Sequence, residues 1–103
     1  MIRSSREIKM NTQMHEDTAR KFKSLAHPIR LKLMQELIKR ECCVGEVQKC
    51  LSVSQPNASQ HLKILKDAEL IEYRRERKKI CYRVSDDPMI RLIKNVLKEN
   101  FNE

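Results

Sequence analysis

A short turn flanked by two amphipathic stretches is the feature that most constrains how this chain can fold. On both sides of residues 52–56 the apolar side chains recur every three or four positions, which is the spacing of one helix face. They are Val47, Cys50 and Leu51 before the turn and Ala58, Leu62 and Leu65 after it. Ser54 is a favoured N-cap residue, and Pro56 fits the first turn of the second helix. The sequence therefore predicts a short helix, a turn of about four residues and a longer helix, which is a helix-turn-helix.

The helical period recurs on both sides of this motif and gives way to alternation in one place. Residues 12–25, the segment that begins at Pro28, and residues 88–101 each carry an apolar stripe. Apolar residues alternate with polar ones on both sides of the charged run 74–79, which predicts a β-hairpin with a basic tip. We therefore expect a mainly α fold with a β-hairpin, of the α+β class: a winged helix-turn-helix with five helices and a two-stranded wing.

Length and motif content favour a small binding domain over an enzyme. A chain of 103 residues fits one domain. Residues 1–11 show no sustained period and are expected to form a flexible N-terminal arm, which leaves residues 12–103 as the winged helix-turn-helix domain. The sequence has no C-x-x-C motif, no glycine-rich cofactor loop and no obvious Ser/His/Asp set, so we expect no enzymatic activity.

The chain is strongly basic, with 22 Lys and Arg against 14 Asp and Glu and a formal net charge of +8. Such an excess favours an acidic partner, either nucleic acid or an anionic membrane surface. No apolar run approaches the roughly 18–20 residues needed to cross a bilayer, and the N-terminal segment lacks the apolar core of a secretory signal. We therefore expect a cytoplasmic protein with nucleic acid as its partner and no membrane contact.

The helix after the turn and the hairpin tip together suit a DNA duplex. A helix presented in this way fits the major groove, and a basic hairpin beside it reaches phosphates or the minor groove. The candidate DNA contacts are Gln55, Asn57, Ser59, Gln60, His61 and Lys63 on the helix, and Arg74, Arg75, Arg77, Lys78 and Lys79 on the hairpin. Two alternatives stay open: the basic face can serve a protein-interaction module, and His61 can pack within the domain.

Four segments of the chain resemble the ArsR/SmtB family of metal- and metalloid-sensing repressors. They are KSLAHPIRLKLMQEL, CVGEV, SQPNASQHLKILKDAELIEYRR and KKICYRV, and they span roughly residues 22–85. The resemblance implies a homodimer that is joined by its first and last helices, binds double-stranded, inverted-repeat operator DNA as a transcriptional repressor, and releases it when an inducer binds. The residues expected at the dimer interface on this basis are Phe22, Ile90, Ile93, Leu97 and Phe101.

The cysteines are the candidate inducer ligands. Cys42 and Cys43 are adjacent, and neighbouring Cα atoms stand about 3.8 Å apart, less than the roughly 4.4–6.8 Å of an unstrained disulfide, so we expect no structural bridge between them. Soft-metal members of the family that this chain resembles begin the helix before the turn with C-V-C; here Cys43 matches the first thiol and Gly45 replaces the second. We expect As(III), Cd(II) or Pb(II) at Cys42 and Cys43, with Cys81 as a candidate third ligand. A thiol-redox response and a ligand-independent repressor stay open as alternatives.

Glycine occurs once in the chain, at Gly45. Members of the ArsR/SmtB family, which this chain resembles, usually place glycine after the recognition helix and at the hairpin turn, where a positive φ is needed. Glu69 and Arg77 occupy those places here. A non-glycine residue in that conformation costs on the order of 1 kcal/mol. Either the two turns take other shapes, or packing elsewhere compensates.

Overall fold

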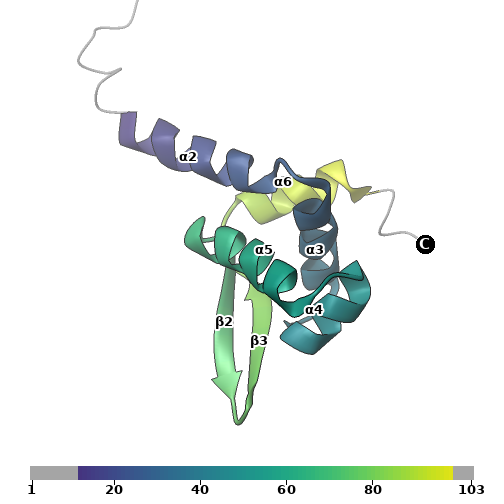
Figure 1. The fold of residues 1–103 in the computed structure, drawn as a ribbon. Coiled ribbons are helices and arrows are strands. Elements are labelled where there is room, and N and C mark those ends of the chain that lie inside the picture. Colours follow the sequence, from purple (N-terminus) through teal and green to yellow (C-terminus); the bar gives the residue numbers. More distant parts are fainter. Residues whose placement is uncertain (1–11, 99–103) are drawn as a thin grey trace, which may run out of the picture.

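A computed structural model describes residues 12–98 of the chain, so the predicted arm at residues 1–11 and the predicted interface residue Phe101 lie outside the described residues. In chain order its elements are α2 (Thr12–Leu25), α3 (Pro28–Lys39), β1 (Cys42–Cys43), α4 (Val44–Leu51), α5 (Gln55–Asp67), β2 (Ile71–Glu76), β3 (Lys79–Val84) and α6 (Met89–Val96). The five predicted helices and the predicted hairpin are confirmed, and the fold is a winged helix-turn-helix (Figure 1). No helix within residues 12–98 combines the length and the apolar content that crossing a bilayer requires.

Capping side chains explain where two of the helices begin. The Nδ1 of His27 accepts a hydrogen bond of 3.1 Å from the Ile29 backbone N–H, and Pro28 occupies the first turn of α3. The Ser54 hydroxyl caps α5 by accepting a hydrogen bond of 3.4 Å from the Asn57 backbone N–H. The cap at Ser54 confirms the helix start expected from sequence, and it holds the direction in which α5 leaves the turn.

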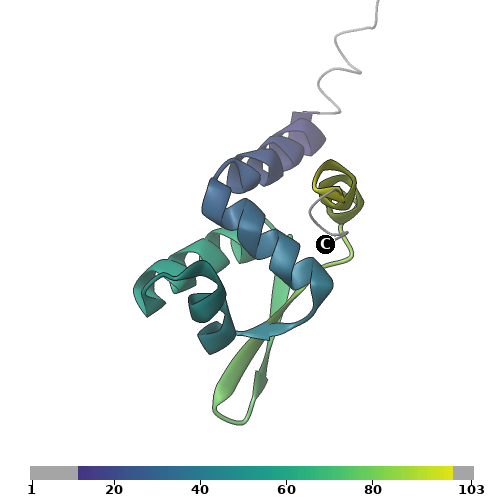
Figure 2. The same ribbon diagram turned by 90° about the vertical axis from the view of Figure 1, so that its right-hand side faces the viewer.

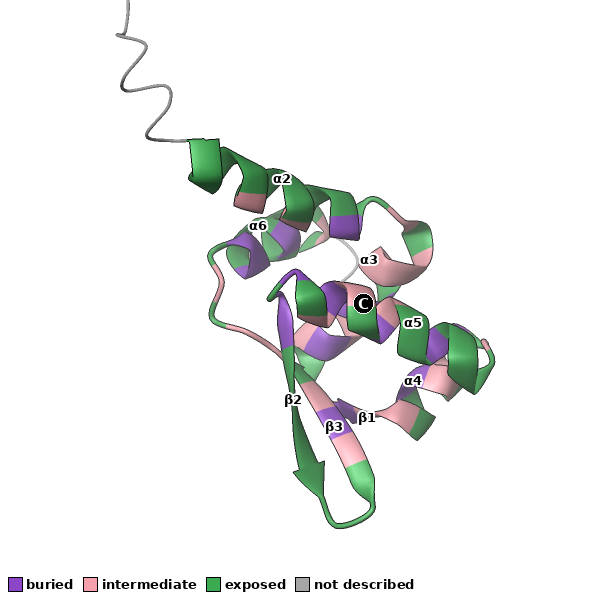
Figure 3. Ribbon diagram, turned by 60° about the vertical axis from the view of Figure 1, so that its left-hand side comes forward, coloured by how far each residue is buried: buried purple, intermediate pink, exposed green. Residues whose placement is uncertain are grey.

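The core lies where α3, α4, α5 and the base of the wing meet. Its largest fully buried side chains are Leu33, Met34, Val47, Leu62, Leu65 and Leu70. Leu62 and Leu65, together with Ala58, form the inner face of α5 as predicted. Because burying one such aliphatic side chain contributes about 1.5–3 kcal/mol, this face sets the orientation of α5 and leaves the opposite face in solvent (Figure 3).

The sheet has one strand more than expected. β3 lies in the middle and pairs antiparallel with β2 on one side and with β1 on the other. β1 consists only of Cys42 and Cys43, which lie opposite Tyr82 and Cys81, respectively. Two residues are too few to display an alternating pattern, so periodicity predicts only the two strands of the hairpin. The additional strand ties the start of α4 to the base of the wing.

Helices α2 and α6 lie near each other at the end of the molecule opposite the wing tip (Figure 2). Lys21 on α2 forms an ion pair with Asp87, in the segment that leads into α6. Asp87 also accepts a hydrogen bond of 2.8 Å from the Met89 backbone N–H, the first residue of α6. The core lies between this helical end and the wing (Figure 1).

The turns that lack glycine keep the left-handed backbone conformation. Glu69, after α5, has a φ of 63°, and Arg77, at the hairpin tip, has a φ of 56°. The two turns therefore keep the shape that glycine favours, and the alternative in which they take other shapes does not hold. The Glu69 carbonyl oxygen accepts a hydrogen bond of 2.8 Å from the Ser85 hydroxyl, a contact that helps to hold the first of these turns.

Candidate nucleic-acid interface and thiol pair

Helix α5 presents a polar face to solvent. The predicted contacts that are exposed on it are Gln55, Asn57, Ser59, Gln60 and Lys63. Their amide and hydroxyl groups donate and accept hydrogen bonds, as contacts to base edges and phosphates require. The first backbone N–H groups of the helix favour an anion in the same place. The Lys63 Nζ contacts an oxygen of Asp67 at 2.7 Å, so the charge of this lysine is partly balanced within the helix.

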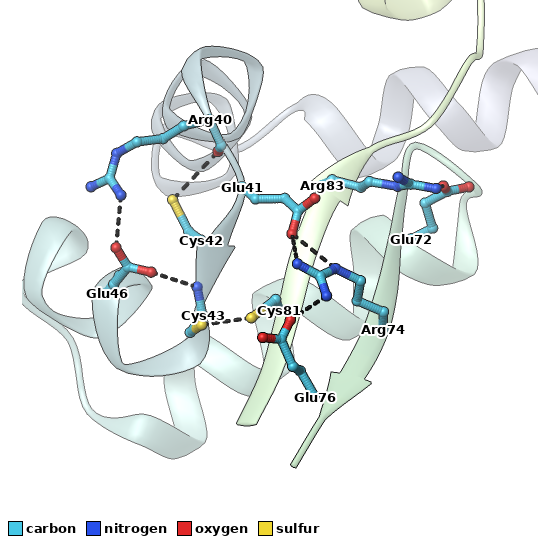
Figure 4. A network of polar contacts seen from close by, with 10 residues as sticks. All are labelled: Arg40, Glu41, Cys42, Cys43, Glu46, Glu72, Arg74, Glu76, Cys81 and Arg83. Atoms are coloured by element: carbon cyan, nitrogen blue, oxygen red, sulfur yellow. Dashed lines mark hydrogen bonds and ion pairs between the residues drawn. The ribbon is translucent and has the colours of Figure 1, made fainter. Parts of the chain in front are cut away.

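The wing adds basic side chains that differ in how free their charges are. Arg74 contacts Glu41 at 2.9 Å and also forms an ion pair with Glu76, so its guanidinium is engaged within the protein (Figure 4). Within residues 12–98 no ion pair engages the other basic residues predicted to contact DNA from the wing, which are Arg75, Arg77, Lys78 and Lys79. These four exposed side chains, the free wing cations, are available to phosphates.

A cleft of about 600 Å³ separates the starts of α4 and α5 from the wing. Gln55 and Ser59 line it from α5, and Lys78 and Lys79 line it from the wing. Cys43 lies in its wall at the start of α4. The polar helix face and two of the free wing cations therefore border one shared space.

His61 does not share the exposure of its neighbours on α5. Its ring lies 4.8 Å from the ring of His27, and its Nδ1 lies 3.3 Å from Nη1 of Arg30. Burial, followed by the charges of His27 and Arg30, lowers the pKa of His61 from its ordinary value. Its position favours the alternative in which this histidine packs within the domain, at the contact between α3 and α5, over a role in contacting DNA.

The apolar side chains at the end opposite the wing form a groove between α2 and α6. It measures about 260 Å³, and its lining includes Phe22, Leu92, Val96 and Leu97. Phe22 is 52% exposed and Val96 is 72% exposed. Ile90 and Ile93, in contrast, are 8% and 4% exposed, and they pack into the core of their own subunit. Ile93 nevertheless belongs to the lining of the groove, whereas Ile90 does not, and the expectation that the two residues contact a second subunit stays a prediction.

The adjacent cysteines point to opposite faces of β1 (Figure 4). The Sγ of buried Cys42 lies 3.6 Å from the Arg40 carbonyl oxygen. Cys43 faces the other way, and its Sγ lies 2.6 Å from the Sγ of Cys81 on β3. Successive side chains of a strand alternate between faces, so the expected pair of Cys42 and Cys43 does not converge on one site within the subunit. The structure brings together Cys43 and Cys81, and it holds no cluster of three or more potential metal ligands within residues 12–98.

The contact with Cys81 is the main cause of the raised pKa of Cys43. The hydrogen bond between the two thiols, with burial acting in the same direction, raises the pKa of Cys43 to about 11. The carboxylate of Glu46 lies beside Cys43: its Oε1 accepts the Cys43 backbone N–H at 2.9 Å, and its Oε2 contacts Arg40 at 2.7 Å. A position at the start of a helix by itself lowers the pKa of a thiol, but here that effect is outweighed. Cys43 is therefore a protonated thiol at neutral pH.

Comparisons with known proteins point to one family. Residues 27–73 match the family described as bacterial regulatory protein, arsR family. A biofilm growth-associated repressor from Agrobacterium fabrum is 44% identical over 72 residues, which are 70% of this chain and 62% of that protein. A biofilm growth-associated repressor from Xylella fastidiosa is 35% identical over 77 residues, which are 75% of this chain and 68% of that protein. The chain thus spans about two thirds of the length of these curated relatives.

Another relative is named for a metal. A cadmium resistance transcriptional regulatory protein CadC homolog from Staphylococcus aureus is 33% identical over 78 residues, which are 75% of this chain and 64% of that protein. The names of the relatives therefore do not agree on one signal.

Solved structures share the fold over nearly the whole chain. A homodimeric winged helix-turn-helix DNA-binding domain from Mycobacterium bovis superposes with a TM-score of 0.80 at 28% identity, covering 95% of this chain and 87% of that chain. The transcriptional repressor BigR from Xylella fastidiosa gives a TM-score of 0.74 at 32% identity, covering 89% and 90%. The fold defines the class, a winged helix-turn-helix protein of the kind found in these regulators. The chain belongs to the arsR family of bacterial regulatory proteins.

Proposed function

We propose that this chain is a cytoplasmic, homodimeric transcriptional repressor that binds an inverted-repeat operator and releases it when an inducer binds. The observation that carries the proposal is the exposed polar face of α5, which borders the same cleft as Lys78 and Lys79 of the wing. Relatives named as repressors support the regulatory role. In this proposal the domain at residues 12–103 serves both DNA binding and dimerisation.

In the complex, α5 lies in the major groove with its N-terminal end towards the DNA. Gln55, Asn57 and Gln60 carry amide groups, which pair with the edge of adenine in the major groove. The Ser59 hydroxyl and the first backbone N–H groups of α5 suit a phosphate. The free wing cations neutralise phosphates of the neighbouring strand and supply the sequence-independent part of the affinity.

The groove between α2 and α6 forms the dimer contact. A single subunit leaves the apolar side chains of Phe22 and Val96 exposed there, and a second copy covers them. The Mycobacterium bovis domain with this fold is described as homodimeric, which supports the same assembly. A two-fold dimer presents two copies of α5, and that symmetry matches an inverted repeat.

Fluorescence anisotropy on the DNA upstream of the gene tests this proposal. The reduced protein is expected to bind that DNA more tightly than a scrambled duplex, with an affinity that falls steeply as salt rises. Lys78→Ala and Gln60→Ala weaken binding, whereas the control Lys94→Ala, exposed on α6 at the end opposite the wing, leaves it unchanged. Equal affinity for both duplexes contradicts specific binding and favours the protein-interaction alternative.

We infer further that the inducer is a soft metal or metalloid ion, As(III), Cd(II) or Pb(II), bound through cysteine sulfur. Thiolates are soft ligands that suit such ions. The geometry favours Cys43 and Cys81, whose sulfurs are neighbours, over Cys42, whose sulfur faces the carbonyl oxygen of Arg40. The cadmium resistance protein among the relatives supports a metal response of this kind.

Metal titrations into the reduced protein test the inducer. Thiolate-to-metal absorption and release of the operator are expected with Cd(II), Pb(II) or As(III), and both are expected to be lost in Cys43→Ser and Cys81→Ser. Cys50→Ser serves as the control, because Cys50 lies on α4 and belongs to neither strand of the thiol pair. Unchanged spectra in both test variants contradict this site, and loss in Cys42→Ser and Cys43→Ser but not in Cys81→Ser restores the pair expected from sequence.

A further inference from the structure

Cys43 and Cys81 face each other directly across the β1 and β3 pair. They are register partners, and their sulfurs are 2.6 Å apart. Directly opposed residues of antiparallel strands have Cα atoms about 4.5–5.5 Å apart. That spacing falls within the roughly 4.4–6.8 Å of unstrained disulfides. The backbone therefore already holds the two cysteines in an arrangement that a disulfide accepts.

The two thiols differ in access to solvent. Cys43 is half-buried and lies in the wall of the cleft between α4, α5 and the wing. Cys81 is 9% exposed and lies behind it on the central strand. A small solute reaches Cys43 first and finds Cys81 next to it. This is the arrangement of a reacting thiol beside a resolving thiol.

We propose that Cys43 and Cys81 form a reversible disulfide when a hydroperoxide oxidises them, and that this bond weakens operator binding. The thiolate form of Cys43, a minor fraction at neutral pH because the pKa of this thiol is raised, attacks the peroxide oxygen, so the reaction is expected to be slow and to speed up as pH rises. This attack gives a sulfenic acid and releases water, or an alcohol if the peroxide is organic. The Cys81 sulfur then attacks the sulfenic sulfur, so the S–S bond forms and the sulfenic oxygen leaves as water. With hydrogen peroxide the balance is two thiols and one peroxide to one disulfide and two waters. A dithiol reductant reverses the step by thiol–disulfide exchange.

The bond connects two parts of the proposed DNA interface. Cys43 is the N-cap residue of α4, the first helix of the helix-turn-helix, and Cys81 lies on β3, two positions after Lys79 of the wing. The cysteines are 38 positions apart, and the segment between them contains α4, α5 and the wing tip. A covalent tie at this point removes the small movements by which the wing and α5 adjust to the same duplex. The effect on DNA rests on the proposed function, whereas the formation of the bond does not.

Peptide mapping of the oxidised chain tests the bond. Reduced protein is treated with hydrogen peroxide, its remaining thiols are blocked, and it is digested with trypsin without reduction. The expected linked product joins residues 41–49 to residues 80–83, and two of the four thiols remain titratable. Because Cys42 and Cys43 share the first peptide, Cys42→Ala and Cys43→Ala form the matched pair: the link is expected to survive in the first variant and to vanish in the second. Cys81→Ala, checked for folding by circular dichroism, is expected to lack it as well.

Other links overturn the proposal. A bond from Cys42 to Cys50, a bond between subunits, or four titratable thiols after peroxide treatment each contradict the pairing of Cys43 with Cys81. Retention of the 41–49 to 80–83 link in Cys43→Ala contradicts it too. These outcomes do not depend on whether the chain binds DNA.

Anisotropy with oxidised and reduced protein tests the consequence for DNA. The oxidised protein is expected to bind the operator at least threefold more weakly, and a dithiol reductant is expected to restore the affinity. Cys43→Ala and Cys81→Ala keep the reduced affinity after peroxide treatment, whereas Cys42→Ala loses affinity as the wild type does. A mapped bond with unchanged affinity overturns the regulatory part. Reduced protein that does not bind the operator contradicts the proposed function instead, while the mapping still decides whether the bond forms.

Discussion

Lys21 on α2 and Asp87 before α6 form an ion pair that links the two helices bordering the apolar groove. Asp87 also accepts the backbone N–H of Met89, so one carboxylate both begins α6 and joins it to α2. The placement of the surface proposed for dimerisation therefore depends on the charge of a single side chain.

Asp87→Asn is expected to lower the free energy of unfolding by about 1–3 kcal/mol, because hydrogen bonds to charged groups contribute about that much. Burial acts to raise the pKa of Asp87, but its contacts with Lys21 and Met89 outweigh burial and hold that pKa below its ordinary value. A carboxylate with a lowered folded pKa stabilises the protein above its unfolded pKa of about 3.9, and this stabilisation is lost as pH falls through the folded pKa. Between about pH 6 and about pH 3, the Tm measured in thermal melts is expected to fall more steeply with decreasing pH for the wild type than for the variant. Asp86→Asn is the matched control, and identical pH profiles for wild type and Asp87→Asn contradict the prediction.

Arg74 and Lys78 are expected to differ in their contribution to DNA binding although both are basic residues of the wing. The Arg74 guanidinium is already engaged by Glu41 and Glu76, so Arg74→Ala removes little attraction for phosphate. Lys78→Ala is expected to weaken binding by a similar factor on all DNA sequences and to reduce the slope of log affinity against log salt by about 1. Anisotropy titrations at several salt concentrations measure both effects. A larger loss in Arg74→Ala than in Lys78→Ala would mean that the ion pairs of Arg74 open on DNA.

Val96→Glu is expected to produce a folded monomer. Val96 is 72% exposed at the groove between α2 and α6, so a charge there does not disturb the subunit's core but opposes its burial against a second copy. Size-exclusion chromatography with light scattering measures the mass, and circular dichroism confirms the fold. Asn95→Glu introduces the same charge at the neighbouring exposed position of α6 and is expected to remain dimeric. A dimeric Val96→Glu protein would place the interface elsewhere.

Arg77→Gly is expected to stabilise the free protein by about 0.5–1 kcal/mol, because glycine adopts the positive φ of this turn position without steric cost. In a domain of this size that change raises Tm by several degrees, at about 4–8 °C per kcal/mol. Lys78→Gly at the next position of the same turn has no positive φ to relieve, so it is expected to lower Tm slightly. Melts of the two variants therefore move in opposite directions, and a decrease in both would show that the Arg77 backbone is not strained.

Alkylation of Cys43 is expected to depend on the presence of Cys81. With the pKa of Cys43 raised to about 11, first by its hydrogen bond with Cys81, the thiolate fraction and hence the alkylation rate rise about tenfold per pH unit between about pH 7 and pH 10. Cys81→Ala removes the largest cause of the shift, so Cys43 in that variant is expected to react faster at pH 8 and to titrate at a lower pH. Mass spectrometry of iodoacetamide-treated protein measures the rate at each cysteine. Equal rates with and without Cys81 would contradict the thiol contact.

Much of the fold could be predicted from sequence because its signals are local. The helical period of α3, α4 and α5 and the Ser54 cap lie within single segments, and so does the alternation of the hairpin. The left-handed turns at Glu69 and Arg77 were recognisable only as places where glycine was expected. Strand β1 was not predictable, since its two residues gain their strand conformation from pairing with β3.

The candidate site was less predictable because it depends on contacts between distant segments. Adjacency in the chain suggested Cys42 with Cys43, but the strand places them on opposite faces and sets Cys43 against a cysteine 38 positions away. The two thiols are separated because successive side chains of a strand alternate between its faces. This alternation can be recognised only once residues 42–43 are known to pair with β3. Likewise, the stripe on α6 indicated that this helix packs on one side, but it did not distinguish Ile93, which is 4% exposed, from Val96, which is 72% exposed at the groove.

Strand β2 is an outer strand of the sheet, since the strand order is β1-β3-β2. Its sequence is IEYRRE, and most of its residues are charged and exposed. A row of free backbone groups invites a strand from another molecule, and charged side chains along that row oppose such an addition. The outer edge of the wing is therefore protected against sheet extension and against the aggregation that follows from it.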